Sequence, residues 1–218
     1  MTQSTILMGK GALAIEIAEW FHDSPDHDLQ LVVPVIPEPT WAPSLADWCA
    51  EHDVPIVESG RFHDIPGVRD DDWHVDVAFS CAYDLIIRQW FIDKCGRILN
   101  LHNSPLPKYR GMAPINWALK RGERMHGATI HEITAGIDDG PIVSQVQYSI
   151  DPAVDEVRDV YERAQRYSLV LFEETMPRLH DITPYEQDHD AAEYFTAEMS
   201  ADLGDRRDFT REISLNRR

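Results

Sequence analysis

The sequence is poor in positive charge and in cysteine. Twenty Lys and Arg residues face 38 Asp and Glu residues, which gives a formal net charge of −18. Such a chain lacks the positive surface by which proteins capture nucleic acid, so we expect no nucleic-acid partner. The three cysteines, Cys49, Cys81 and Cys95, are an odd number without C-x-x-C spacing. They indicate reduced thiols and a cytoplasmic protein.

Long hydrophobic runs are also absent. The longest, Leu31 to Ile36, is interrupted by Pro34 and is too short to cross a bilayer. The first eight residues lack a cationic start, and Glu16 and Glu19 interrupt the next apolar stretch. We therefore expect neither a signal peptide nor a membrane partner. Hydrophobic residues still make up 43% of the 218 residues, which is enough for one globular domain with a true core.

Apolar runs of strand length alternate with runs of helical period along the chain. The predicted strands are Thr5–Met8, Leu29–Val35, Val54–Val57, Val75–Cys81, Ile98–Leu101, Ala128–Thr134 and Ile142–Ile150. The predicted helices are Ala12–Phe21, Leu45–His52, Arg88–Lys94, Pro114–Lys120 and 155–180. This alternation predicts an α/β fold with a Rossmann-like, mostly parallel sheet flanked by helices. We expect one domain over 1–180 and a short, polar C-terminal extension over 181–218, such as a small hairpin.

Asn100 and His102 stand two residues apart at the end of an apolar run, just before a loop with two prolines. Because side chains alternate faces along a strand, both point to the side opposite Leu99 and Leu101. Strand ends are the usual ligand sites of open α/β sheets. An amide and an imidazole there can polarise a carbonyl group and handle a proton at one centre. Taken alone, a histidine at a strand end is more often structural.

Two turns have both a functional and a structural interpretation. The Gly9-Lys10-Gly11 turn follows the first predicted strand and precedes a helix, so it can admit a phosphate or another anion. It matches neither G-x-G-x-x-G nor a Walker A loop, and a simple tight turn is the more common explanation. Asp138 lies in the turn A-G-I-D-D-G-P, where an aspartate most often accepts hydrogen bonds from its own turn.

A resemblance gives these residues a common function. The stretches LNLHNSPLPKYRGMAPINWAL and HGATIHEITAGIDDGPI closely resemble the catalytic core of the folate-dependent formyltransferases. In that family an Asn-x-His pair precedes a Leu-Pro loop that reaches a glycine, and an Asp-x-Gly turn follows downstream. These positions fall here on Asn100, His102, Gly111 and Asp138. The resemblance is strongest over residues 75–150, and it is most similar to the sugar N-formyltransferase branch.

The resemblance implies transfer of a formyl group from 10-formyltetrahydrofolate to a primary amine, without a metal. It implies that Asn100 stabilises the oxyanion, that His102 handles the amine proton, and that Asp138 orients His102 or a water. It places the donor against Cys81, Tyr83, Asp84, Leu85, Ile86, Ile87 and Asp138. It places the acceptor against Gly9, Lys10, Ser104 and Met112. The range 1–180 would then be the catalytic domain, and the branch implies a homodimer.

The acceptor is left open by the sequence. The branch-like features favour a nucleotide-linked amino-deoxysugar, while glycinamide ribonucleotide or another small amine is an alternative. Methionyl-tRNA is disfavoured because the acidic chain would have to contact RNA. Hydrolysis of the formylfolate and a non-catalytic folate-binding relative are further alternatives, although pure binding would not need the Asn–His pair. The ten histidines lack paired ligand spacing, which argues against a metal-dependent hydrolase.

Overall fold

The computed structural model describes residues 2–203. Its chain divides into two compact units, which are described separately. The first unit contains the chain up to Leu101 together with Ile133–Ala135. The second contains His102–Glu132 and the chain from Gly136 onward. Residues 204–218, the last part of the predicted C-terminal extension, lie outside the described residues.

The first unit is built on parallel strands in the order β2-β1-β3-β4. Their bounds are β1 Gln3–Gly9, β2 His27–Pro34, β3 Val75–Cys81 and β4 Cys95–His102, of which the last residue belongs to the second unit. The order reverses between β1 and β3, because β2 lies on one side of β1 and β3 on the other. Ligands bind at the carboxyl ends of strands beside such a switch point. These ends are therefore the place where a site is expected.

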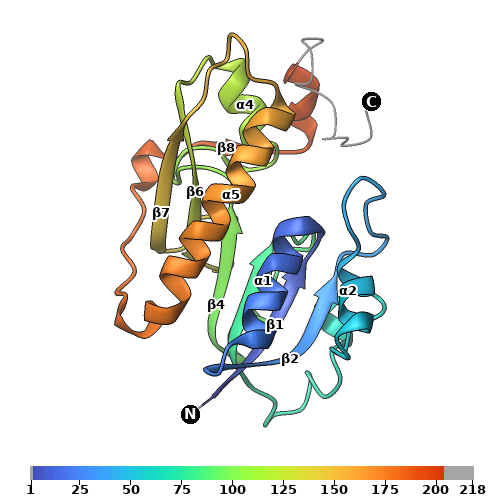
Figure 1. Ribbon diagram of the computed structural model, residues 1–218. Coiled ribbons are helices and arrows are strands. Elements are labelled where there is room, and N and C mark those ends of the chain that lie inside the picture. Colours follow the sequence, from blue (N-terminus) through green and yellow to red (C-terminus); the bar gives the residue numbers. More distant parts are fainter. Residues whose placement is uncertain (1, 204–218) are drawn as a thin grey trace. The chain divides into compact units, whose positions relative to one another are not determined.

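Helices and a shared apolar cluster support this sheet. Helix α1 (Gly11–Asp23) packs on β1 and β2, and α2 (Leu45–Glu51) packs on α1 and β2 (Figure 1). The chain continues through η1 (Phe62–Asp64) and α3 (Gln89–Ile92). The two central strands β1 and β3 are almost wholly buried, as apolar runs covered on both faces should be. One cluster of buried side chains includes Ile6, Met8, Val33, Phe62, Val75, Ala78, Phe91 and Ile98.

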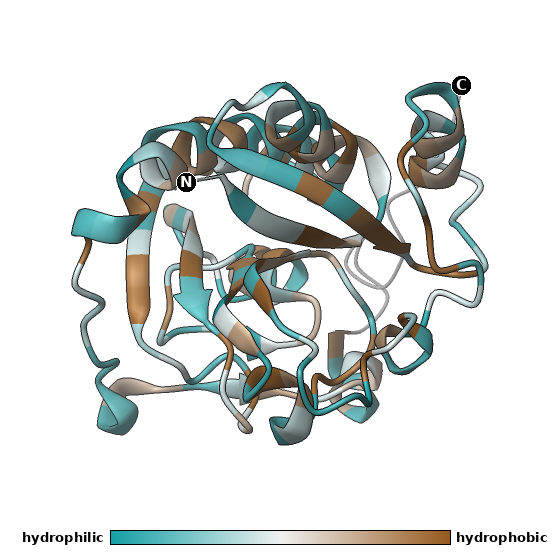
Figure 2. Cartoon of the chain, turned by 90° about the horizontal axis from the view of Figure 1, so that it is seen from below, coloured by the Kyte–Doolittle hydropathy of each residue, from teal (hydrophilic) through white to brown (hydrophobic). Residues whose placement is uncertain are grey.

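The second unit combines an antiparallel strand pair with a long helix. Strands β6 (Met125–Glu132) and β7 (Ile142–Ser149) pair antiparallel, and α5 (Val157–Thr175) packs along both (Figure 1). Helix α4 (Pro114–Lys120) packs against α5. Hydrophobic and hydrophilic segments alternate along strands in Figure 2, as expected for strands with one covered face. The unit's core includes Tyr109, Ile115, Trp117, Leu119, Tyr148, Ile150, Val160, Ala164 and Phe195.

Helix α5 buries nearly the stripe that its sequence predicts. Its buried residues are Val157, Val160, Ala164, Ser168, Leu171, Phe172 and Thr175, at the i, i+3, i+4 spacing of one helix face. A capping box begins the helix, because Glu156 and Asp159 each accept from the other's backbone. The prediction that it reaches residue 180 is wrong. The chain turns into η2 (Met176–Asp181), in which Pro177 has no N–H to continue the α-helical pattern.

Two other parts of the chain depart from the predicted pattern. The strand predicted over 54–57 is not formed, because Ile56 makes only an isolated parallel bridge with Val32. The extension after α5 contributes β8 (Tyr194–Phe195), which pairs in parallel with β5 (Arg110–Gly111). Through residue 203 its strand thus pairs with an earlier loop and not within a hairpin of its own. The remaining short elements are η3 (His189–Ala191) and η4 (Glu198–Leu203).

A helix that spans a membrane needs sufficient length and hydropathy. None of the helices of residues 2–203 is both long enough and apolar enough to cross a bilayer.

Candidate active site

The switch point of the first unit brings two predicted binding segments together. Gly9 and Cys81 end the neighbouring strands β1 and β3 in the same register. Lys10 donates its backbone N–H to the Cys81 carbonyl at 3.3 Å. A Cβ on Gly9 would collide with that carbonyl. Glycine at this position is therefore explained by close strand packing, whatever ligand the turn receives.

The Lys10 side chain forms an ion pair with the loop that follows β3. Its ammonium group lies 2.7 Å from both carboxylate oxygens of Asp84. An anion that binds at the Gly9-Lys10-Gly11 turn would have to compete with this carboxylate for the lysine. The two predicted segments are thus tied to each other at the surface. The pair gives the switch point a mixed charge.

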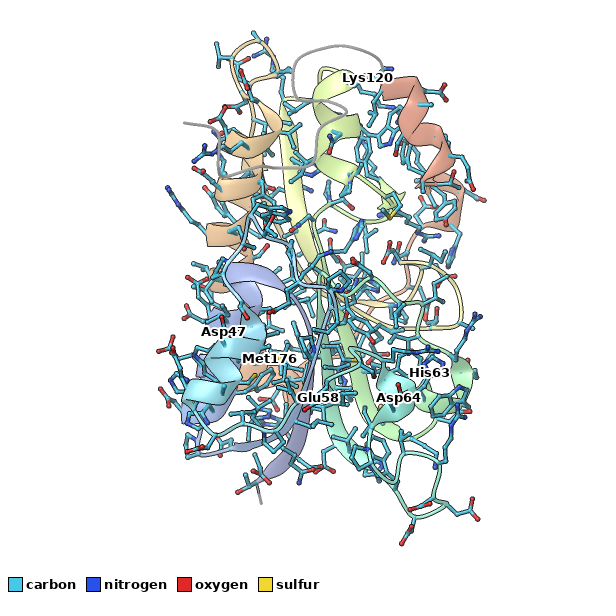
Figure 3. All side chains as sticks on the ribbon, turned by 90° about the vertical axis from the view of Figure 1, so that its right-hand side faces the viewer. Asp47, Glu58, His63, Asp64, Lys120 and Met176 are labelled. Atoms are coloured by element: carbon cyan, nitrogen blue, oxygen red, sulfur yellow. The ribbon has the colours of Figure 1, made fainter. Side chains whose placement is uncertain are left out.

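The loop after β3 presents its side chains in two directions. Tyr83 reaches back into the unit, where its hydroxyl donates to the Gly60 carbonyl at 2.8 Å and accepts from the Phe62 N–H at 3.2 Å. Burial raises the pKa of Tyr83 to about 12, so this hydroxyl is neutral. The Tyr83 hydroxyl thus contacts the first residue of η1, whose other residues, His63 and Asp64, are labelled in Figure 3. Leu85 and Ile86 are exposed, while Ile87 packs into the core. The exposed pair offers apolar surface to a flat ring.

Asn100 occupies the part of β4 that lies in the first unit. It pairs in register with Ser80 of β3, and it is half-buried between the fully covered Leu99 and Leu101. This alternation is the one predicted from its position in the strand. β4 ends two residues later with His102, so the strand spacing turns both side chains to one face.

Asp138 contacts three separate segments of the second unit. Its Oδ2 accepts from the Gly111 backbone N–H at 2.8 Å and lies 3.6 Å from Nδ1 of His102. Its Oδ1 lies 3.5 Å from Nε2 of His131. The residue adopts a left-handed backbone conformation, with φ of 50°, which aspartate tolerates better than most residues. Three segments of the unit therefore meet at one carboxylate.

The environment of Asp138 fixes its charge. Burial on its own raises the pKa of this carboxyl group, but the facing His102 and His131 and the Gly111 N–H together hold the pKa well below its usual range. Asp138 is consequently an anion that accepts from the Gly111 N–H and faces a histidine ring on each side. A carboxylate with several donors keeps its position and its charge.

The hydrogen bonds of His102 define which ring nitrogen carries a proton. Nε2 lies 2.8 Å from the Tyr109 carbonyl, which can only accept. Nε2 must therefore donate, and Nδ1 is left facing Asp138. The Tyr109 carbonyl is presented by a left-handed residue, with φ of 60°. The Tyr109 carbonyl thus orients the imidazole, and the Nδ1 edge of the ring faces the Asp138 carboxylate.

The loop between His102 and Gly111 is held by buried polar groups. Ser104 is fully buried, donates its hydroxyl to the Lys108 carbonyl at 2.7 Å, and receives the Thr129 hydroxyl on its own carbonyl at 2.7 Å. Gln145 donates to the Leu106 carbonyl and to Thr129, each at 2.9 Å. The structure thus gives Ser104 a clear part in building the loop. Met112, the other acceptor candidate in this loop, is exposed directly after Gly111.

Sequence reasoning missed two residues of this site. His131 belongs to the quoted T-I-H-E-I segment, and its spacing of two from Thr129 on β6 was the available signal. Gln187 donates to the carbonyl of Asp138 at 2.9 Å and to that of Gly140 at 2.7 Å. It lies in the polar extension after α5, where no periodicity singles it out.

Comparison with known proteins supports the predicted family. Residues 69–175 match the family described as formyl transferase, a range that includes His102, Gly111 and Asp138. A methionyl-tRNA formyltransferase from Fervidobacterium nodosum is 31% identical over 144 residues, which are 66% of this chain and 46% of that protein. The chain spans half or less of the length of this curated relative and of a second one from Pseudothermotoga lettingae.

Solved structures share the fold. WlaRD, a sugar 3N-formyl transferase crystallised with dTDP and 5-N-formyl-THF, has a TM-score of 0.77 at 24% identity, covering 91% of this chain and 70% of that one. An N-formyltransferase from Helicobacter canadensis, in complex with folinic acid and dTDP-3-aminofucose, has a TM-score of 0.74 at 22% identity, covering 91% and 72%. The predicted α/β fold is confirmed. Residues 69–175 of the chain belong to the formyl transferase family.

Proposed function

We propose that this protein transfers a formyl group from 10-formyltetrahydrofolate to the primary amine of a nucleotide-linked amino-deoxysugar. The observation that carries the proposal is the Asp138 carboxylate, fixed between His102, His131 and the Gly111 N–H inside the matched family range. The reaction needs a base of fixed position for the amine proton. It also needs donors for a developing oxyanion.

The chemistry assigned to these residues is an acyl transfer. The amine nitrogen attacks the formyl carbon, and the carbonyl oxygen becomes an oxyanion that the Asn100 amide and the His102 ring stabilise. Collapse of the tetrahedral intermediate breaks the bond between the formyl carbon and N10 of the folate. The amine loses a proton and N10 gains one. Asp138 holds His102 in orientation and receives or passes on the proton, directly or through a water.

The donor is assigned to the loop after β3. The exposed Leu85 and Ile86 offer a face for the pterin ring, next to the backbone of Cys81 and Ile87. Tyr83 and Asp84 are held by the Gly60 carbonyl and by Lys10, so their part is to shape the loop. The structures that bind formylated folates, WlaRD and the Helicobacter canadensis enzyme, support this cofactor.

Two observations favour a nucleotide sugar as acceptor. WlaRD is a sugar formyltransferase and the Helicobacter canadensis enzyme holds a dTDP-amino sugar. The net charge of −18 disfavours an RNA substrate. Methionyl-tRNA is the second candidate, because the curated relative from Fervidobacterium nodosum is named a methionyl-tRNA formyltransferase. We further propose a cytoplasmic protein, active as a homodimer and without a metal.

The test is an acceptor panel. Purified protein is mixed with 10-formyltetrahydrofolate and one amine at a time: dTDP- and UDP-amino sugars, glycinamide ribonucleotide, hydroxyornithine and methionyl-tRNA. Tetrahydrofolate release and acceptor mass are followed together, with Asn100→Ala and Asp138→Asn as controls. A gain of one formyl group on an amino sugar, lost in both variants, is the expected result. Formylation of methionyl-tRNA alone would replace the sugar with the second candidate. Folate release with every amine unmodified would instead indicate a hydrolase.

A further inference from the structure

Gln187 joins the two backbone segments that hold Asp138. Its Nε2 donates to the carbonyls of Asp138 and Gly140, at 2.9 and 2.7 Å. Its Oε1 accepts from Nε and Nη2 of Arg110, at 3.0 and 2.6 Å. Arg110 is the residue before Gly111, whose N–H donates to the Asp138 carboxylate. One side-chain amide therefore connects the turn that carries Asp138 with the strand that carries the Gly111 N–H.

Only a glutamine amide fits this position. A carbonyl can only accept, so the atom facing Asp138 and Gly140 must be the NH₂ group. A guanidinium can only donate, so the atom facing Arg110 must be the oxygen. The orientation of the amide is therefore set by its partners. Both Gln187 and Arg110 are buried, where an unmade hydrogen bond costs more than it does at the surface.

The segment around Gln187 is anchored on both sides. Before it, Tyr185 makes an antiparallel bridge with Ile142. After it, Arg110 donates its N–H to the Glu193 carbonyl, and Met112 donates to the Phe195 carbonyl. The segment thus follows both the strand after the Asp138 turn and the strand that contains Gly111. Its position is defined independently of Gln187.

We propose that Gln187 is a positioning residue for formyl transfer: it holds the strained Asp138 backbone so that the carboxylate meets His102 and the Gly111 N–H. The inference rests on the proposed role of Asp138. Asp138 keeps a left-handed φ of 50°, a conformation that costs energy in a non-glycine residue and that contacts from the surroundings stabilise. Gln187 imposes it by binding the carbonyls on both sides of Asp139. Small displacements of a reacting group slow catalysis strongly.

Two substitutions separate positioning from folding. Gln187→Met keeps the length of the side chain and removes all four hydrogen bonds. Gln187→Glu keeps an acceptor for Arg110 and creates an ion pair there, but it sets a carboxylate oxygen against the carbonyls of Asp138 and Gly140. We expect Gln187→Glu to fold and nevertheless to fail in positioning. The matched control is Thr175→Val, which removes the buried hydrogen bonds of Thr175 to Ser144 and to the Leu171 carbonyl, away from the turn.

The direct readout is the NMR resonance of the Gly111 amide proton, which reports its hydrogen bond to Asp138 without any substrate. We expect it to move upfield in both Gln187 variants and to stay in place in Thr175→Val. With the acceptor found by the panel, kcat should fall about 10- to 100-fold in the Gln187 variants, while KM for the formyl donor changes less than about threefold. An unmoved Gly111 resonance in Gln187→Glu would overturn the proposal, as would an equal loss of kcat in Thr175→Val. If the wild-type protein transfers no formyl group, the resonance still decides whether Gln187 positions Asp138.

Discussion

Two aspartates on loops of this protein are held in opposite ways. Asp84, in the loop after β3, pairs with Lys10 and has a side chain that is 57% exposed. Asp138, in the turn before β7, has a side chain that is 15% exposed and is contacted by His102, His131 and Gly111. The first belongs to the segment proposed to bind the donor, and the second is the carboxylate proposed to orient His102.

The difference follows from what each loop has to do. A segment that binds and releases a large cofactor must be able to change its conformation. An exposed ion pair suits such a segment, because it stabilises one conformation by only about 0.2–1 kcal/mol. A carboxylate that orients a proton-handling histidine must keep its position through the reaction. Hydrogen bonds to a charged group contribute about 1.5–3 kcal/mol each, and burial makes their loss costly. Asp138 is therefore surrounded by buried polar groups, whereas Asp84 is held by a partly exposed ion pair.

The largest effect is expected from Asp138→Asn. The substitution keeps an acceptor for the Gly111 N–H but removes the negative charge that faces His102 and His131. The rate of formyl transfer should fall about 10²- to 10⁴-fold, as expected when proton transfer through His102 loses the carboxylate that faces the ring. Initial rates of tetrahydrofolate release measure this.

Asp139→Asn is the matched control, because it makes the same change one residue away. Its activity should stay within about threefold of the wild-type value, in keeping with the small effect of changes that leave the reacting groups in place. An equal loss in both variants would mean that the turn as a whole matters and that Asp138 has no special part in the chemistry.

The next effect concerns stability and separates two glycines of the second unit. Gly111 and Gly122 have similar positive φ values, 87° and 74°, but a Cβ on Gly111 would collide with the Phe195 carbonyl, while nothing lies within 4 Å of one on Gly122. Gly122→Ala should lower the free energy of unfolding by about 1–2 kcal/mol, the cost of the left-handed conformation. Gly111→Ala should cost about 2 kcal/mol more, because β5 must move away from β8. Urea unfolding of both variants tests this, and equal losses would contradict the described pairing of the two strands.

The sequence predicted the scaffold better than the contacts that complete the site. Strands such as Val75–Cys81 are continuous apolar runs, and local pattern identifies them. The strand predicted over 54–57 does not form, because a strand needs backbone partners along its length and Ile56 alone bridges to Val32. His102 and Asp138 were identified because they stand in the Asn-x-His and Asp-x-Gly motifs, which follow each other in the order seen in the family. Gln187 lies 49 residues from Asp138 in the chain, and no periodicity relates two loops that meet only in the folded unit.

The smallest effect is expected at the surface pair of the first unit. In a double-mutant cycle of Lys10→Met and Asp84→Asn, the coupling free energy of unfolding should be about 0.2–1 kcal/mol, as for other exposed pairs, and it should shrink in high salt. The exposed pair Arg158–Glu162 on α5, 2.8 Å apart, provides the reference cycle. Each single substitution breaks the ion pair, and its kinetic effect should appear chiefly in KM for donor or acceptor. The value of kcat should stay within about threefold, since no proton of the reaction passes through this pair. A coupling well above that of the reference pair, or a kcat loss approaching that of Asp138→Asn, would show that the switch-point loop is as rigidly organised as the catalytic turn and would remove the contrast between the two aspartates.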